Sequence, residues 1–209
     1  MATLLRTWAF RYPWLYDCIS WTTAWLVGGE GRLRQLPLRG VPALSGQMVL
    51  DLCCGSGLSS QTLVGQGARL TGLDCSVVAI HAARERIPSA TFVQGRAERL
   101  PFPEATFDLV HTSLALHEMS PGGVLKICQE VYRVLKPGGV FVLLDFHCPA
   151  NPLFWPGLAL FLWIFETQTS WQLIQTDLRA LLRVQGFESA NQTLYAGGSL
   201  QVLQAHKRT

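Results

Sequence analysis

An acid and a loop of small residues stand out in the first half of the chain. Residues 49–57 read Val-Leu-Asp-Leu-Cys-Cys-Gly-Ser-Gly, so that Gly55 and Gly57 follow an apolar run that contains Asp51. Glycine lets the backbone turn tightly and approach a ligand without a Cβ in the way. Asp74 ends the next apolar run, where its carboxylate could accept hydrogen bonds from ribose hydroxyls. This spacing predicts a nucleotide-containing cofactor at the loop.

Two cofactor classes fit such a loop, the dinucleotides and S-adenosylmethionine. The dinucleotide fingerprint Gly-x-Gly-x-x-Gly/Ala fails at its last position, which is Ser60 here. Asp51 would also repel an anionic pyrophosphate, whereas it would attract the cationic ammonium and sulfonium of S-adenosylmethionine. The electrostatics therefore favour S-adenosylmethionine over a dinucleotide and its oxidoreductase chemistry.

The elements that must position these residues alternate between strand-like and helix-like segments, which is typical of a parallel α/β sheet. We expect strands at residues 47–52, 69–73, 91–94, 107–112, 140–146, 188–194 and 199–205. We expect helices at residues 59–64, 77–86, 121–135 and 171–185. Ser120 followed by Pro121 is a favourable helix start, and the glycines at 138 and 139 are typical of a helix stop.

In order along residues 45–147, these motifs resemble those of the class I S-adenosylmethionine-dependent methyltransferases. Residues 49–57 are similar to the first motif of that family and residues 73–76 to the second. Residues 94–102, 107–110 and 133–139 are similar to the later motifs. The resemblance implies a Rossmann-like, seven-stranded, mostly parallel sheet with helices on both faces. It also implies transfer of a methyl group from S-adenosylmethionine.

Two positions depart from the family pattern. Cys53 stands where the family usually has glycine, and Arg96 stands where it often has an aspartate that accepts from the adenine amino group. An arginine side chain cannot accept a hydrogen bond. Adenine must then be held by the backbone of Ala97, by Glu98 or by packing. These departures support the alternative of a non-catalytic protein of this fold that binds a partner through a Trp-rich surface, whereas the retained Asp51, Gly55, Gly57, Asp74 and Tyr16 count against it.

The resemblance implies a set of cofactor-binding residues, which are Tyr16, Asp51, Cys53, Gly55, Gly57, Asp74, Cys75, Ala97, Ser113 and Leu114. In-line methyl transfer needs no protein nucleophile, but methylation of a phenolic ring at carbon benefits from a base. His117 and Glu118 follow the fourth strand, and Asp145 and His147 end the fifth. His117 is our candidate base, with a buried structural histidine as the alternative. Asp74 could instead cap a helix, and Asp108 could act in a site or only anchor a strand.

The flanks predict a lipophilic acceptor. We expect one domain with a helical arm at 1–40, a cofactor-binding core at 45–147 and substrate-side segments at 148–209. Tyr16 and Asp17 resemble a segment of the ubiquinone/menaquinone C-methyltransferase group, which implies a prenyl-quinone or lipid precursor. All seven tryptophans lie outside the core, at positions 8, 14, 21, 25, 155, 163 and 171. Together with nearby arginines they predict an apolar mouth at a membrane surface or, alternatively, a packed lid.

Composition excludes other classes. The 209 residues carry a net charge of +3, and only 15% are charged, without the dense basic run typical of nucleic-acid binding. The six cysteines include no Cys-x-x-Cys pair, so we expect no metal and no disulfide, as in a cytoplasmic protein with reduced thiols. The apolar run at 153–165 is shorter than the roughly 20 residues that a membrane-spanning helix needs. The oligomeric state and the identity of the acceptor stay open.

Overall fold

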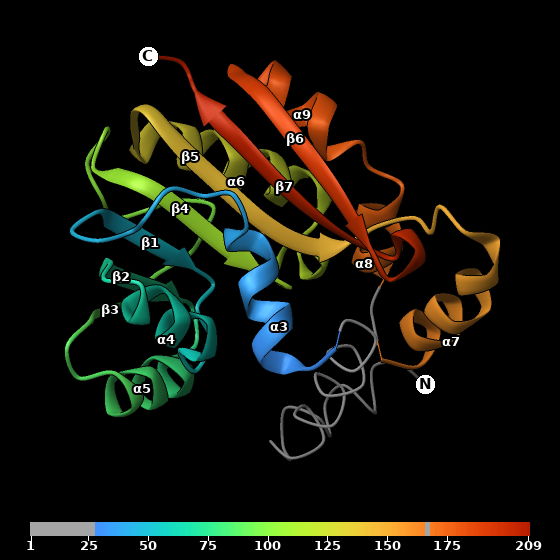
Figure 1. Ribbon diagram of the computed structural model, residues 1–209, viewed down its shortest axis with the longest axis horizontal. Coiled ribbons are helices and arrows are strands. Elements are labelled where there is room, and N and C mark those ends of the chain that lie inside the picture. Colours follow the sequence, from blue (N-terminus) through green and yellow to red (C-terminus); the bar gives the residue numbers. More distant parts are fainter. Residues whose placement is uncertain (1–27, 166–167) are drawn as a thin grey trace.

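A seven-stranded sheet forms the centre of the computed structural model, which describes residues 28–165 and 168–209 (Figure 1). The strands lie in the order β3-β2-β1-β4-β5-β7-β6. Strands β1 to β5 pair in parallel, and β7 runs antiparallel to both β5 and β6. They are β1 (Met48–Leu52), β2 (Arg69–Asp74), β3 (Thr91–Gln94), β4 (Phe107–Ser113), β5 (Leu135–Phe146), β6 (Phe187–Tyr195) and β7 (Leu200–Lys207). The predicted fold class is confirmed.

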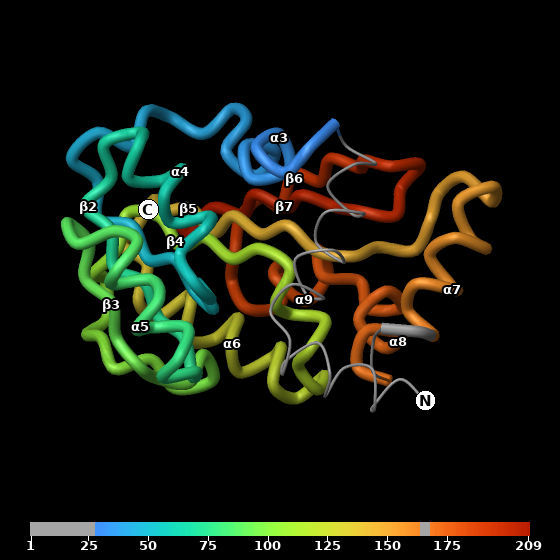
Figure 2. Tube along the Cα trace, turned by 90° about the horizontal axis from the view of Figure 1, so that it is seen from below, coloured from blue at the N-terminus to red at the C-terminus, as the bar shows by residue number. Residues whose placement is uncertain are grey.

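Helices cover both faces of this sheet. They are α3 (Glu30–Gln35), α4 (Leu58–Gly65), α5 (Val77–Arg86), α6 (Pro121–Val134), α7 (Trp155–Phe165), α8 (Gln168–Ile174) and α9 (Leu178–Val184). Leu63 of α4 and Ile80 of α5 are buried in one core cluster, and Ile127 of α6 and Leu182 of α9 are buried in another. Figure 2 shows the sheet between α3 and α4 on one side and α6 and α9 on the other.

Capping explains why two of the predicted helices begin where they do. The Ser76 hydroxyl accepts a hydrogen bond from the Ala79 N–H at the start of α5, and Ser120 does the same for Gly123 in α6. Pro121 occupies the first position of α6, where its missing N–H costs nothing. Helix α5 and strand β3 have the bounds that the sequence predicts.

The predicted single helix at 171–185 is wrong, because the chain breaks there into α8 and α9. The Thr176 N–H bonds to the Leu173 carbonyl at 2.9 Å, which closes the end of α8. The Asp177 carboxylate then accepts from the Ala180 N–H and begins a second helix. Strand β5 also begins earlier than predicted. It starts at Leu135, directly after α6, so the glycines at 138 and 139 lie within the strand rather than after a helix.

Parallel pairing brings the carboxyl ends of β1, β2, β4 and β5 to one edge of the sheet. Asp108 lies near the start of β4, at the opposite edge, where it accepts from the Met48 N–H and the Lys136 ammonium. Burial raises the pKa of Asp108, but these two bonds outweigh burial and hold the pKa below its usual value. Of the two roles left open for Asp108, the structural one is found.

The segment after β5 forms a short 3₁₀ helix, Pro152–Phe154, and then α7, which lies beyond the end of β5 (Figure 1). Leu158 and Leu162 of α7 are buried in a cluster with Leu144 and Phe146. On the outer side, Leu160 is 56% exposed and Trp163 is 61% exposed, so α7 presents an apolar surface to solvent. No helix in the described residues is long and apolar enough to cross a membrane.

Candidate functional site

The loop after β1 turns on three residues in the left-handed region. The φ angles of Cys53, Gly55 and Gly57 are 58°, 52° and 81°. Gly57 leads directly into α4, and a Cβ built on it would lie 3.3 Å from the Cβ of Ala83. Apart from chain neighbours, no described atom lies within 4 Å of the position that a Cβ on Gly55 would take. The backbone at Gly55 is therefore open to close approach by a ligand.

Asp74 ties this loop to the end of β2. Its Oδ2 accepts a hydrogen bond from the Gly55 N–H at 2.9 Å, and its Oδ1 accepts one from the Ser76 N–H at 2.9 Å. The Ser76 bond resembles the helix-start role that the sequence left as an alternative, whereas the Gly55 bond was not foreseen. Each carboxylate oxygen can accept more than one hydrogen bond, so Asp74 can also accept from ribose hydroxyls.

Asp51 lies beneath the loop and is only 1% exposed. Its Oδ1 lies 2.8 Å from Nδ1 of His111, and its Oδ2 accepts from the Ser60 hydroxyl at 2.5 Å. The predicted attraction of Asp51 for a cation would therefore act across the loop rather than by direct contact. Sequence reasoning missed His111 and Ser60. The available signal was a histidine directly after the apolar pair Leu109 and Val110, within a predicted strand.

The turn after β3 holds Ala97 and Glu98, the two residues proposed to hold adenine. Ala97 is 4% exposed. The Arg96 side chain is 77% exposed, and it donates to the Glu98 carboxylate at 3.0 Å. Burial raises the pKa of Glu98, but hydrogen bonds from its own backbone and from Arg96 outweigh burial and lower it. Arg96 is thus engaged with Glu98. Cys75 is exposed at the end of β2, and its carbonyl accepts from the Gln94 amide at 3.2 Å.

The end of β4 brings the predicted Ser113 and Leu114 to the same edge. Leu114 has a φ of 52°, and its N–H bonds to the Leu144 carbonyl of β5 at 2.8 Å. This left-handed turn sends the chain over the end of β5, into the short 3₁₀ helix Leu116–Glu118. The turn therefore places His117 beside the last residues of β5.

His117 is 5% exposed and pairs with Asp145, which is fully buried. Its Nδ1 lies 2.7 Å from Oδ1 of Asp145, and its ring packs against Phe146 with centroids 4.7 Å apart. The Asp145 carboxylate also accepts from the backbone N–H groups of Leu116 and Phe146 at 2.8 Å. A carboxylate with such donors acts as an acceptor, so we assign the His117 proton to Nδ1. The structure thus joins His117 to Asp145, two of the four side chains at the ends of the fourth and fifth strands that the sequence offered for acid–base chemistry.

The thiols in this region are held in the neutral form. Burial raises the pKa of both Cys53 and Cys54, and the nearby carboxylates of Asp74 and Asp51 raise it further. No cluster of metal-ligating side chains occurs in residues 28–165 and 168–209. Tyr16 and the four tryptophans of the predicted arm lie outside the described residues.

Comparison with known protein sequences finds a matching family and several relatives. A methyltransferase domain family matches residues 49–139. An uncharacterized methyltransferase of Synechocystis is 55% identical over 205 residues, covering 98% of this chain and 97% of that protein. A demethylmenaquinone methyltransferase of Thermobifida fusca is 35% identical over 159 residues, covering 73% of this chain and 64% of that protein.

Solved structures match in fold. Phosphoethanolamine N-methyltransferase 2 of Haemonchus contortus, determined in complex with S-adenosyl-L-methionine, superposes with a TM-score of 0.69. Its sequence is 16% identical, and the match covers 93% of this chain and 56% of that chain. At this identity the likeness concerns the fold alone. The matched segment 49–139 contains the loop, Asp74, Ala97 and His117, whereas Asp145 and α7 lie beyond it.

Proposed function

The chain belongs to the class I S-adenosylmethionine-dependent methyltransferases, and we propose that it methylates a small lipophilic acceptor of the prenyl-quinone or lipid-precursor type. The observation that carries the acceptor class is the exposed apolar surface of α7, packed over the end of β5. The demethylmenaquinone methyltransferase relative supports a quinone-like acceptor. This chain covers 64% of that relative's length, so its substrate enters here as a proposal.

The residues of the loop fit S-adenosylmethionine. The open backbone at Gly55 gives room for the cofactor, and Asp74 offers acceptors for the ribose hydroxyls. Asp51 supplies negative charge beneath the loop, which suits the cationic methionine end. Ala97, Ser113 and Leu114 would line the adenine and methionine sides, as the family resemblance implies. The cofactor, when bound, supplies an electrophilic methyl group, and the chain supplies alignment and exclusion of water.

The His117–Asp145 pair suits the role of base for a ring hydroxyl of the acceptor. With Nδ1–H donated to Asp145, a proton taken from the acceptor goes to Nε2, and the carboxylate stabilises the resulting imidazolium. Burial of the pair, with the His117 ring against Phe146, limits competition from water. In this proposal, His117 holds the proton and Asp145 positions the ring.

The apolar wall beside this pair comes from α7 and its neighbours. Leu114, Phe146, Leu158 and Leu162 belong to one cluster, which joins the ends of β4 and β5 to α7. Trp155 stacks on Trp171 with centroids 6.4 Å apart, so part of the tryptophan set packs internally, while Trp163 faces outward. We propose that the outward surface meets the isoprenoid or acyl part of the acceptor at a membrane surface, with Arg32 and Arg39 near anionic headgroups.

The test is to incubate the protein with methyl-labelled S-adenosylmethionine and either a membrane-lipid extract or an extract of soluble metabolites. We expect label in the organic phase of the lipid reaction, and the labelled product identifies the acceptor. Label confined to aqueous products would overturn the lipophilic acceptor while leaving the family assignment in place. Transfer of no label in either reaction would contradict the proposed catalytic function.

A pair of variants separates the α7 surface from general apolar exposure. Trp163→Gln changes the outer face of α7, and Val184→Gln changes an apolar side chain on α9 that is 81% exposed. We expect W163Q to lower transfer to the lipid extract and binding to anionic vesicles, and V184Q to leave both within about twofold of wild type. Equal effects of the two changes would remove α7 from the proposal.

A further inference from the structure

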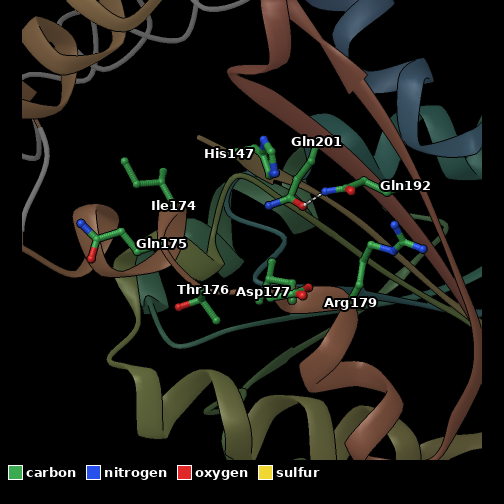
Figure 3. A pocket seen from close by; sticks show the side chains of 9 residues that line it. His147, Ile174, Gln175, Thr176, Asp177, Arg179, Gln192 and Gln201 are labelled. Carbon is green, nitrogen blue, oxygen red and sulfur yellow. Dashed lines mark hydrogen bonds between the residues drawn. The ribbon is translucent and has the colours of Figure 1, made fainter. Parts of the chain in front are cut away.

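A cavity of about 310 Å³ lies beside the end of β5, apart from the glycine loop (Figure 3). Most of the side chains that line it are polar, and they come from the residue after β5, from β6 and β7, and from the end of α8 through the start of α9. Figure 3 shows His147, Gln192 and Gln201 on one side of the cavity, with Arg179 rising toward Gln192 from α9. A polar cavity of this size suits a small polar molecule rather than an isoprenoid chain.

Arg179 is the cation of this cavity. Its Nε is buried, and no hydrogen-bond partner occurs for it in the described part of the chain. Asp177 also lines the cavity, but its carboxylate caps α9 through the Ala180 N–H, and no ion pair joins it to Arg179. A buried guanidinium donor without an acceptor is costly, and a planar oxyanion such as a carboxylate satisfies the guanidinium fork best.

Three polar side chains on the sheet side of the cavity, those of His147, Gln192 and Gln201, are fixed in orientation by bonds to the protein. The Gln192 amide N–H donates to the Gln201 carbonyl at 2.9 Å, and the Gln201 amide donates to the Phe146 backbone carbonyl at 3.0 Å. Nδ1 of His147 lies 2.9 Å from the Gly198 carbonyl, so Nδ1 carries the proton there. This arrangement leaves the Gln192 carbonyl oxygen and Nε2 of His147 as acceptors for a ligand hydroxyl.

The cavity lies at the sheet edge that also carries the proposed methyl-transfer site. Gln201 pairs in register with Asp145, the partner of His117, and His147 follows β5 directly. Along this edge, the glycine loop comes at β1, the His117–Asp145 pair at β4 and β5, and the cavity at β5, β7 and β6. The cavity is therefore on the acceptor side of the loop, next to the proposed base.

We propose that this cavity binds the carboxylate of a small hydroxylated molecule, with Arg179 as the anion-binding residue and Gln192 and His147 as acceptors for the hydroxyl. The proposal goes beyond the proposed function, because it rests on the cavity alone. The carboxylate can belong to the methyl acceptor or to a separate ligand.

The experiment compares benzoate with benzamide, which has nearly the same shape but no charge. Each is titrated into the full chain, with the glutamine side-chain amide NMR signals as the readout. Wild-type protein should show saturable shifts with benzoate, and benzamide should bind at least about tenfold more weakly, because a charged hydrogen bond is lost. Absence of saturable binding by benzoate, or equal binding of the two probes, would overturn the proposal.

Variants locate the binding. Arg179→Gln should weaken benzoate at least about tenfold, whereas Arg183→Gln, an exposed arginine of the same helix, should stay within about twofold. Arg179→Lys keeps the charge without the planar fork and should fall between them. Equal losses in R179Q and R183Q would contradict the assignment. Should R179Q fail to fold, R179K and the two probes on wild type still decide it.

Two further measurements complete the test. One asks whether the carboxylate belongs to the methyl acceptor or to a separate ligand, and the other separates the cavity proposal from the proposed methyltransferase function. Benzoate that lowers labelled methyl transfer to the extract means that the acceptor occupies the cavity, whereas binding without inhibition means a separate ligand. Affinity for S-adenosylhomocysteine, measured on the same samples, should be unchanged in R179Q. If the wild-type protein bound S-adenosylhomocysteine but not benzoate, the cavity proposal would be wrong and the proposed methyltransferase function would be unaffected.

Discussion

The loop after β1 is held to the end of β2 through its backbone N–H groups, whereas around β4, β5 and β7 the sheet edge is organised by side chains that bind one another. In the first region, the Gly55 N–H bonds to Asp74 and the Cys54 N–H bonds to the Leu73 carbonyl at 3.0 Å. In the second, His117 pairs with Asp145 and Gln192 pairs with Gln201. The first arrangement exposes backbone groups of small residues above two acids, Asp51 and Asp74, whereas the second depends on pairs of larger side chains.

This difference separates the two halves of the proposed reaction. A backbone-built loop suits a ligand that is the same in every member of a family, since it depends on φ angles and glycines. In the proposed function, side-chain pairs at the other half determine which acceptor is held and where its proton goes. We therefore expect changes at Asp74 to affect cofactor binding and changes at His117 to affect the chemical step.

The largest effect is expected at Asp74. Asp74→Ala removes the proposed ribose acceptors and the bond that holds Gly55, so S-adenosylhomocysteine should bind roughly 1,000-fold more weakly by calorimetry. Asp108→Asn is the matched control, because it changes a partly buried aspartate at the opposite edge of the sheet. D108N should cost some stability and leave the affinity within about threefold. An equal loss of S-adenosylhomocysteine affinity in both variants would show that Asp74 does not bind the ribose.

A smaller effect, confined to turnover, is expected at His117. His117→Gln can keep a donor toward Asp145 but cannot take a proton, so kcat should fall roughly 100-fold while cofactor affinity holds. His206→Gln, at an exposed position on β7, is the control and should change neither. The measurement uses the acceptor identified in the label-transfer experiment. Full activity of H117Q across pH would show that the histidine is structural.

The sequence was informative where local chemistry decides the structure. The bounds predicted for helix α5 are confirmed, and they follow from local chemistry, since Ser76 caps its start and Pro88 follows its end. The glycine loop was predicted because Gly55 and Gly57 follow an apolar strand. The resemblance to a family extended this local information to Ala97, Ser113 and Leu114, which the structure places at strand ends or turns near the same edge.

The rest depends on contacts between distant segments. His111 meets Asp51 because β1 and β4 are neighbours whose register pairs these two residues, which the sequence order does not reveal. The cavity combines His147, which follows β5, with residues from β6, β7 and α9, so no local pattern marks it. The break between α8 and α9 was missed because Asp177 was not recognised as a cap within an apolar periodic segment.

A network of side chains on α6 holds residues 100–102, which follow the turn proposed for adenine. Glu130 of α6 accepts from Arg133 at 2.7 Å and from the Leu100 N–H at 2.6 Å, and Arg133 also donates to the carbonyl of Phe102. The hydrogen bond from Arg133 is the main cause that lowers the pKa of Glu130 below its usual 4.5. The ion pair therefore stabilises the fold above about pH 4.5, and this gain is lost as pH falls through the lower folded-state pKa.

Glu130→Gln should accordingly lower the free energy of unfolding by about 1–2 kcal/mol at pH 7, with the difference from wild type shrinking below pH 4.5. Urea titrations at several pH values measure it. Glu85→Gln removes a carboxylate that is 72% exposed, and it should have little effect at any pH. A difference for E130Q that does not vary with pH would mean that packing, not charge, holds Leu100 and Phe102.

The smallest effect concerns Cys53, where the loop departs from the family's glycine. Its φ of 58° strains any side chain with a Cβ, so Cys53→Gly should be more stable than Cys53→Ala by about 0.5–1 kcal/mol in urea unfolding. Both variants lose the same sulfur, and the comparison therefore isolates the backbone conformation. At Cys128, buried inside α6, the order should reverse, with alanine about 1 kcal/mol more stable than glycine. If alanine were more stable than glycine at both positions, the left-handed backbone at Cys53 would not be a source of strain, and the proposed role of the backbone in shaping the loop would be wrong.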